Sequence, residues 1–100
     1  MINADQIITK QLEKCLNVMT GKRKEYAQDN DRLHNFHVAQ HILNCNTKQA
    51  IAGMMAKHTV SVYDMCNSGE DYPIELWEEK ITDSINYLLL LKIAVEESNG

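Results

Sequence analysis

The scarcity of residues that interrupt helices is the feature that most constrains this chain. In 100 residues there is one proline, Pro73, and there are four glycines. These residues are the strongest breakers of regular structure, and no alternating β-branched runs are bounded by turns, so strands are not expected. The chain length corresponds to one domain with a small core. We therefore predict a single all-α domain over residues 1–100, built like a four-helix bundle.

Hydrophobic residues that recur at helical spacing divide the chain into four predicted segments. They cover about residues 4–20, residues 31–44, residues 46–66, and a stretch from Pro73 past Val95. Gly21 can end the first helix or be carried through it. Asn46, with Gln49 three residues later, has the pattern of a capping box and predicts a clear start for the third helix. Because the connection 66–72 is short, the third and fourth helices are predicted to be antiparallel.

Composition and charge exclude several classes of function. The net charge is −4 and the sequence pI is about 5.5, which argues against general binding of duplex nucleic acid, because neutralising phosphates needs a basic surface. Cys15, Cys45 and Cys66 are odd in number and widely spaced, so we expect free thiols in a reducing cytoplasm. The first ten residues do not resemble a signal peptide, and the apolar run 87–91 is too short to cross a membrane. A cytoplasmic protein without a membrane segment is expected.

Two polar stripes interrupt the hydrophobic pattern of the third and fourth segments. They consist of Lys57, Ser61 and Asp64 in the third segment, and of Glu79, Asp83 and Asn86 in the fourth. Each stripe has the spacing i, i+4, i+7, which places its members along one face of a helix. Facing stripes would form a site, whereas solvated stripes would form none. Asp83 stands between Ile81 and Ile85, where a carboxylate is poorly solvated and needs a partner.

Several roles are open for these stripes. Glu79 and Asp83 can hold Mg²⁺ through oxygens, or they can belong to a solvated acidic face near a helix start. Lys57 can meet a ligand phosphate, or it can form a salt bridge with Asp83 that fixes the register of the two helices. The neutral side chains Ser61 and Asn86 suit contacts with a ribose or a base. His58 lies on the apolar stripe and is expected to be a core histidine.

A second candidate site is the only dense basic cluster of this acidic chain. Its cations are Lys22, Arg23 and Lys24, and Tyr26, His34 and Phe36 follow as aromatic side chains. Cations bind phosphates and aromatic rings stack on bases, so this composition suits a nucleotide. The alternative is a solvated basic turn, balanced by the acidic residues that follow it.

Three motifs in this order resemble a family of small phage and prophage proteins. The motifs are KRKEYAQDNDRLHNF, AGMMAKHTVSVYDM and YPIELWEEKITDSINYLLLL, and together they extend over about residues 22–97. They are similar to the nucleotide-modification-associated domain of phage genomes, which in turn resembles the all-α MazG-type nucleoside-triphosphate pyrophosphatases. The resemblance implies an all-α fold, a nucleotide ligand, a homo-oligomer, and, for a phage protein, the cytoplasm of the host cell.

The resemblance also implies a metal site, from which this chain departs. MazG-type enzymes bind Mg²⁺ through an ExxE motif on one helix and an ExxD motif on a following one. Here EEKITD provides Glu79 and Asp83 at a spacing of four, and AKHTVSVYD, with Lys57, Ser61 and Asp64, stands in place of ExxE. A lysine at this place can replace the charge of the metal.

Three functions follow as hypotheses. The first is a phage-encoded protein that binds a nucleotide between the third and fourth helices and sequesters it, for example a signalling nucleotide of host defence. The second is a pyrophosphohydrolase in which Asp64, Glu79 and Asp83 hold Mg²⁺ and Lys57 orients phosphates. The third is an oligomeric interaction protein, in which the surface of residues 88–91 forms an oligomer or docks a host protein and the polar stripes are structural.

Overall fold

In the computed structural model, residues 2–26 and 32–99 are described, and they form four α-helices and no strand. The helices are α1 (Ala4–Tyr26), α2 (His34–Leu43), α3 (Thr47–Asn67) and α4 (Ile74–Asn99). The all-α prediction is therefore confirmed for this part of the chain. For residues 22–26 and 99 the description extends to the backbone only.

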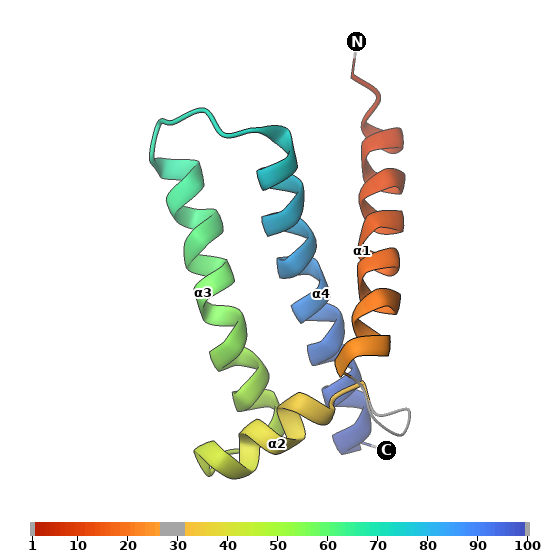
Figure 1. The fold of residues 1–100 in the computed structure, drawn as a ribbon, viewed down its shortest axis with the longest axis vertical. Helices are drawn as coiled ribbons and strands as arrows, with labels where there is room; N and C mark the ends of the chain where they lie inside the picture. The colour runs from red at the N-terminus through yellow and green to blue at the C-terminus, as the bar shows by residue number, and fades with distance from the viewer. Residues whose placement is uncertain (1, 27–31, 100) are drawn as a thin grey trace.

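The three long helices lie along the length of the molecule, and α2 crosses one end (Figure 1). α4 packs against α3 on one side and against α1 on the other, while α2 packs against α3. The loop that connects the end of α3 to the start of α4 lies at the end of the molecule where α1 begins (Figure 1). The chain is elongated, with extents of 46 × 27 × 25 Å.

The helix boundaries follow the local signals in part. Asn46 and Gln49 form the predicted capping box: the Asn46 side chain accepts from the Gln49 N–H at 2.8 Å, and Gln49 Oε1 accepts from the Asn46 N–H at 3.0 Å. α3 then ends at Asn67, shortly before Gly69 with a φ of 75°, a value that favours glycine. α1 runs past the expected end near residue 20, because a single glycine costs a helix only about 1 kcal/mol. Gly21 is thus carried through the helix.

α2 begins later than the expected residue 31. Its first residue is His34, and the preceding Leu33 is fully buried. The Leu33 carbonyl accepts hydrogen bonds from the N–H groups of Phe36 and His37, both at 2.9 Å, and so forms the first turn. Leu33, which helical spacing marks as an apolar position, is thus buried immediately before the helix and not within it.

The hydrophobic core lies where α2, α3 and α4 meet. Its buried members are Leu33, Phe36, Ile51 and Ala94, with Tyr87, Leu90, Leu91 and Ile93 packed around them. The ring of Phe36 meets the ring of Tyr87 edge-on, with 6.1 Å between centroids. α1 contributes little to this core, and among its described side chains only Cys15 is buried.

A candidate polar site between α3 and α4

A half-buried polar group, which we call the Asp83 group, lies where α3 packs against α4. It consists of Asp83 and Tyr87, one helical turn apart on α4, and of His58 on α3. Oδ2 of Asp83 is 3.8 Å from Nδ1 of His58, and the two side chains are 18% and 16% exposed. The rings of His58 and Tyr87 pack with centroids 4.9 Å apart and planes tilted by 35°. A carboxylate, an imidazole and a phenol thus share one place that water only partly reaches.

The environment of Tyr87 keeps its phenol neutral at ordinary pH. Burial raises the pKa of Tyr87 above its usual value of 10.0, and the negative charge of the nearby Asp83 raises this pKa further. Both causes disfavour the phenolate, the first because a charge is poorly solvated there and the second because like charges repel. The Tyr87 hydroxyl is therefore available as a hydrogen-bond donor at neutral pH.

The structure places His58, the residue after the predicted partner Lys57, beside Asp83. Lys57 is exposed, whereas His58 turns toward α4. Consecutive residues of a helix point about 100° apart, so a shift of one position decides which side chain reaches the neighbouring helix. The carboxylate does have a nearby partner, as its apolar surroundings predicted.

The second polar stripe divides between two neighbours of α4. Asp83 turns toward α3, whereas Asn86 is 7% exposed and faces α1, where its Nδ2 donates to the Cys15 carbonyl at 3.2 Å. Asn86 Oδ1 is buried and accepts no hydrogen bond from the described residues. Glu79 is exposed, and so is Asp64 on the first stripe, while Ser61 is half-buried. The two stripes therefore do not face each other as complete sets.

Sequence reasoning missed a polar contact between α1 and α4. Gln11 Nε2 donates to Thr82 Oγ1 at 2.8 Å, and it also lies 3.4 Å from the Cys15 sulfur. Thr82 is 2% exposed and Asn86 follows it by one turn, so both belong to the face that α1 covers. The spacing of four on both helices, from Gln11 to Cys15 and from Thr82 to Asn86, is the signal that pairs them.

The predicted magnesium ligands do not assemble in the described part of the chain. No group of three or more His, Cys, Asp or Glu side chains there is placed to hold a metal ion. Asp64 and Glu79 are exposed, and Asp83 lies beside an imidazole. These residues as placed do not fit a three-carboxylate Mg²⁺ site, and we derive no chemical step through a metal.

The basic cluster can be placed only in part. α1 continues through Lys22, Arg23, Lys24 and Tyr26, but their side chains lie outside the described residues. His34 is half-buried at the start of α2. Phe36 is 7% exposed and packs in the core, which leaves little of its ring to stack on a ligand.

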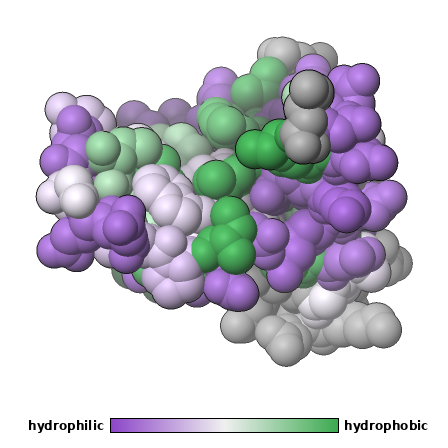
Figure 2. Space-filling view, turned by 90° about the horizontal axis from the view of Figure 1, so that it is seen from above, coloured by the Kyte–Doolittle hydropathy of each residue, from purple (hydrophilic) through white to green (hydrophobic). Residues whose placement is uncertain are grey.

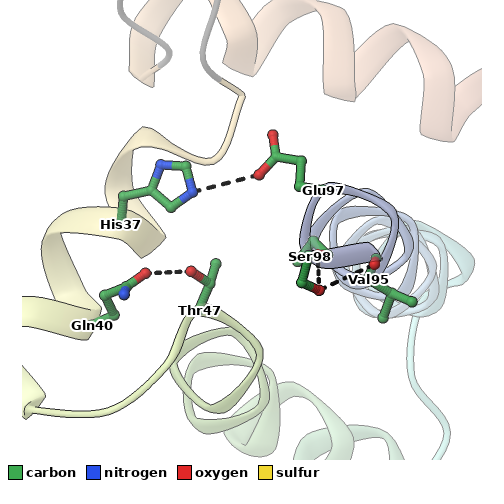
Figure 3. Close-up of polar contacts among 7 residues, drawn as sticks. His37, Gln40, Thr47, Val95, Glu97 and Ser98 are labelled. Atoms are coloured by element: carbon green, nitrogen blue, oxygen red, sulfur yellow. Dashed lines mark hydrogen bonds and ion pairs between the residues drawn. The ribbon is translucent and has the colours of Figure 1, made fainter. Parts of the chain in front are cut away.

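A separate small pocket lies where α2, the start of α3 and the end of α4 approach one another. It has a volume of about 260 Å³ and is lined by Gln40, Asn46, Thr47, Lys48, Ala94, Glu97 and Ser98. Figure 3 shows its polar contacts: Thr47 donates a hydrogen bond to Gln40, and His37 Nε2 lies 3.6 Å from Glu97 Oε2. The Ser98 hydroxyl lies within hydrogen-bond distance of the Ala94 and Val95 carbonyls, at 2.9 and 3.1 Å. The nearest polar side chains are thus already engaged with one another or with the backbone.

Comparison with known proteins adds no relative. No family model, no curated protein and no solved structure matches this chain. Within the part that the structure describes, no helix has the length and hydrophobicity needed to cross a membrane.

Proposed function

We infer that the protein binds a nucleotide at the Asp83 group, between α3 and α4. The observation that carries this inference is a half-buried carboxylate whose surroundings combine an imidazole and a neutral phenol. Titratable side chains whose pKa is shifted by burial and by a neighbouring charge gather at functional sites, and partial access of water would let a ligand reach this group. The alternative for the same three residues is a structural contact that holds α3 on α4.

Two members of the group and two neighbouring residues of α3 contact the ligand in this proposal. Asp83 accepts hydrogen bonds from ribose hydroxyls or from base N–H groups, and Tyr87 donates one from its neutral hydroxyl. The half-buried Ser61 lies one turn beyond His58 on α3 and adds a second small donor. Lys57, exposed beside His58, attracts the phosphates.

The proposal favours capture over hydrolysis. A lysine stands where MazG-type enzymes carry metal carboxylates, and a cation can neutralise a phosphate without activating water. In its full form the proposal is a phage-encoded, MazG-like protein, with α3 and α4 antiparallel, that sequesters a signalling nucleotide of host defence in the cytoplasm. Mg²⁺-dependent pyrophosphohydrolysis is the alternative, although Asp64, Glu79 and Asp83 as placed do not fit its metal site.

A ligand screen tests this function. The protein is incubated with nucleoside triphosphates and cyclic dinucleotides, with and without Mg²⁺, and its melting temperature and the release of pyrophosphate are measured. We expect a rise in melting temperature with one ligand class, and intact ligand recovered after denaturation. Asp83→Asn should abolish the rise, whereas Asp71→Asn, an exposed carboxylate of the α3–α4 loop, should preserve it.

Two results would contradict this proposal. Turnover that depends on Mg²⁺ would favour the pyrophosphohydrolase instead. No turnover and no change in melting temperature with any ligand would remove both nucleotide functions and leave the interaction protein.

A further inference from the structure

The chain exposes more surface than a compact protein of its mass. Its accessible surface is 7415 Å² for 11.5 kDa, whereas folded monomers of this mass expose about 5,800 Å². The difference is about 1,600 Å² per chain. Large hydrophobic side chains of α1 and α4 lie exposed on this surface. Such a surface is typical of a protein that buries one face against another protein.

Three exposed apolar residues of α4 lie on one line along the helix with two half-buried apolar residues and two charged ones, and we call this line the α4 seam. Its members are Ile74, Glu78, Ile81, Ile85, Leu88, Lys92 and Val95. The steps between them alternate between four and three residues, which is the repeat of helices that pack side by side as a coiled coil. Ile74 is 65% exposed and Leu88 is 55% exposed, although hydrophobic residues at these positions normally pack against a neighbouring helix.

Neighbouring side chains of α1 widen this apolar face. Leu12 and Leu16 are exposed, and Leu16 follows Cys15, which faces α4, whereas Ile85 precedes Asn86, which faces α1. A step of one residue turns about 100°, forward on α1 and backward on α4. α1 and α4 begin at the same end of the molecule (Figure 1). One residue forward on α1 and one residue backward on α4 therefore turn toward the same side of the helix pair, so the exposed leucines of α1 lie beside the α4 seam. Viewed from that end, hydrophobic residues gather over the centre between hydrophilic flanks (Figure 2).

Two charges in the α4 seam indicate what covers it. Glu78 and Lys92 lie seven residues before and after Ile85, and they carry opposite charges. When two identical seams pack in opposite directions, Glu78 comes close to Lys92 of the partner subunit, and the same contact forms a second time by symmetry. Parallel packing would instead place like charges together. The present contact of Lys92 is a surface pair with Glu96, with both side chains more than two-thirds exposed, which costs little to give up.

We propose that two copies of this chain form a dimer in which their α4 seams pack antiparallel, flanked by the exposed leucines of α1. The excess of about 1,600 Å² per copy is larger than the roughly 800 Å² that each partner buries in a stable interface of standard size. The opposed charges select the antiparallel direction. The Asp83 group lies on the side of α4 that faces α3, so the dimer does not depend on the nucleotide proposal.

Sedimentation analysis over a wide concentration range, without nucleotide, tests this dimer. The native chain should sediment at twice the chain mass of 11.5 kDa. Leu88→Glu should yield a monomer, whereas Val60→Glu, a matched change at an exposed position of α3, should leave the dimer intact. Circular dichroism confirms that each variant is helical.

Charge reversal tests the direction of packing. Glu78→Lys and Lys92→Glu should each weaken dimerisation about tenfold, because each creates two like-charge contacts. The double reversal should restore native dimerisation. The proposal would be overturned if the native chain stays monomeric, or if Leu88→Glu leaves the dimer intact. If the double reversal does not restore dimerisation, the antiparallel arrangement is wrong. If Leu88→Glu does not fold, the exposed charge variants decide the question alone.

Discussion

Replacing Asn86 by leucine tests the description of the buried contact between α1 and α4. Asn86→Leu removes the hydrogen bond to the Cys15 carbonyl, which contributes about 1 kcal/mol net. It also removes the buried Oδ1, for which no hydrogen bond forms in the described part of the chain, and an unsatisfied atom of this kind costs about 1–3 kcal/mol. Leucine branches at the same carbon, and its extra volume offsets part of the gain by about 1 kcal/mol.

The balance of these terms predicts that Asn86→Leu changes the free energy of unfolding by no more than about 1 kcal/mol in either direction, or the melting temperature by no more than about 5 °C. Urea unfolding followed by circular dichroism measures the first quantity. Asn86→Asp is the matched control, because it keeps the shape but buries a charge and should lower stability by about 3 kcal/mol. A loss of more than about 2 kcal/mol in Asn86→Leu would refute the reasoning, since it would mean that Oδ1 has an effective partner.

Two further predictions concern the core and the Asp83 group. Ile51→Ala should lower the free energy of unfolding by about 2–5 kcal/mol, because Ile51 is fully buried, whereas Val60→Ala at an exposed position of α3 should change it by less than about 0.5 kcal/mol in the same urea experiment. Tyr87 should ionise at higher pH than exposed tyrosines in an ultraviolet titration. Because the pKa of Tyr87 is raised by folding, its contribution to stability is complete below about pH 10 and is lost as pH rises through the folded-state pKa. The variant Tyr87→Phe should therefore lose less stability at alkaline pH than the native chain. A Tyr87 that titrates with the exposed tyrosines would contradict its burial beside Asp83.

Local signals in the sequence were sufficient for the elements of the fold. The capping box of Asn46 and Gln49, Pro73 ahead of the last helix, and the apolar repeats predicted four helices, which the described residues form. These signals act within one or two turns of a helix, so they do not depend on the rest of the molecule. The end of α1 was not predictable in this way, because a single glycine weakens a helix without stopping it.

Of the candidate site, the sequence predicted the central carboxylate, Asp83, but not the side chains that surround it. The apolar neighbours of Asp83 indicated that it needs a partner, but the choice of His58 over Lys57 depends on how α3 is rotated against α4. In the same way, the spacing of Asn86 placed it in line with Asp83, although packing of α1 draws it to the other side. Rotations of this size are set by contacts between helices, which spacing along one helix does not contain.

The most direct test of the central claim is to locate the ligand in solution. In a nuclear magnetic resonance titration with the nucleotide class that raises the melting temperature, we predict that the ring signals of Tyr87 and His58 shift together, with the same dissociation constant as the thermal effect. Signals of the exposed Tyr63 on α3 should stay unchanged. A titration in which the Tyr87 and His58 signals do not move, or in which Tyr63 moves instead, would contradict a nucleotide site at the Asp83 group.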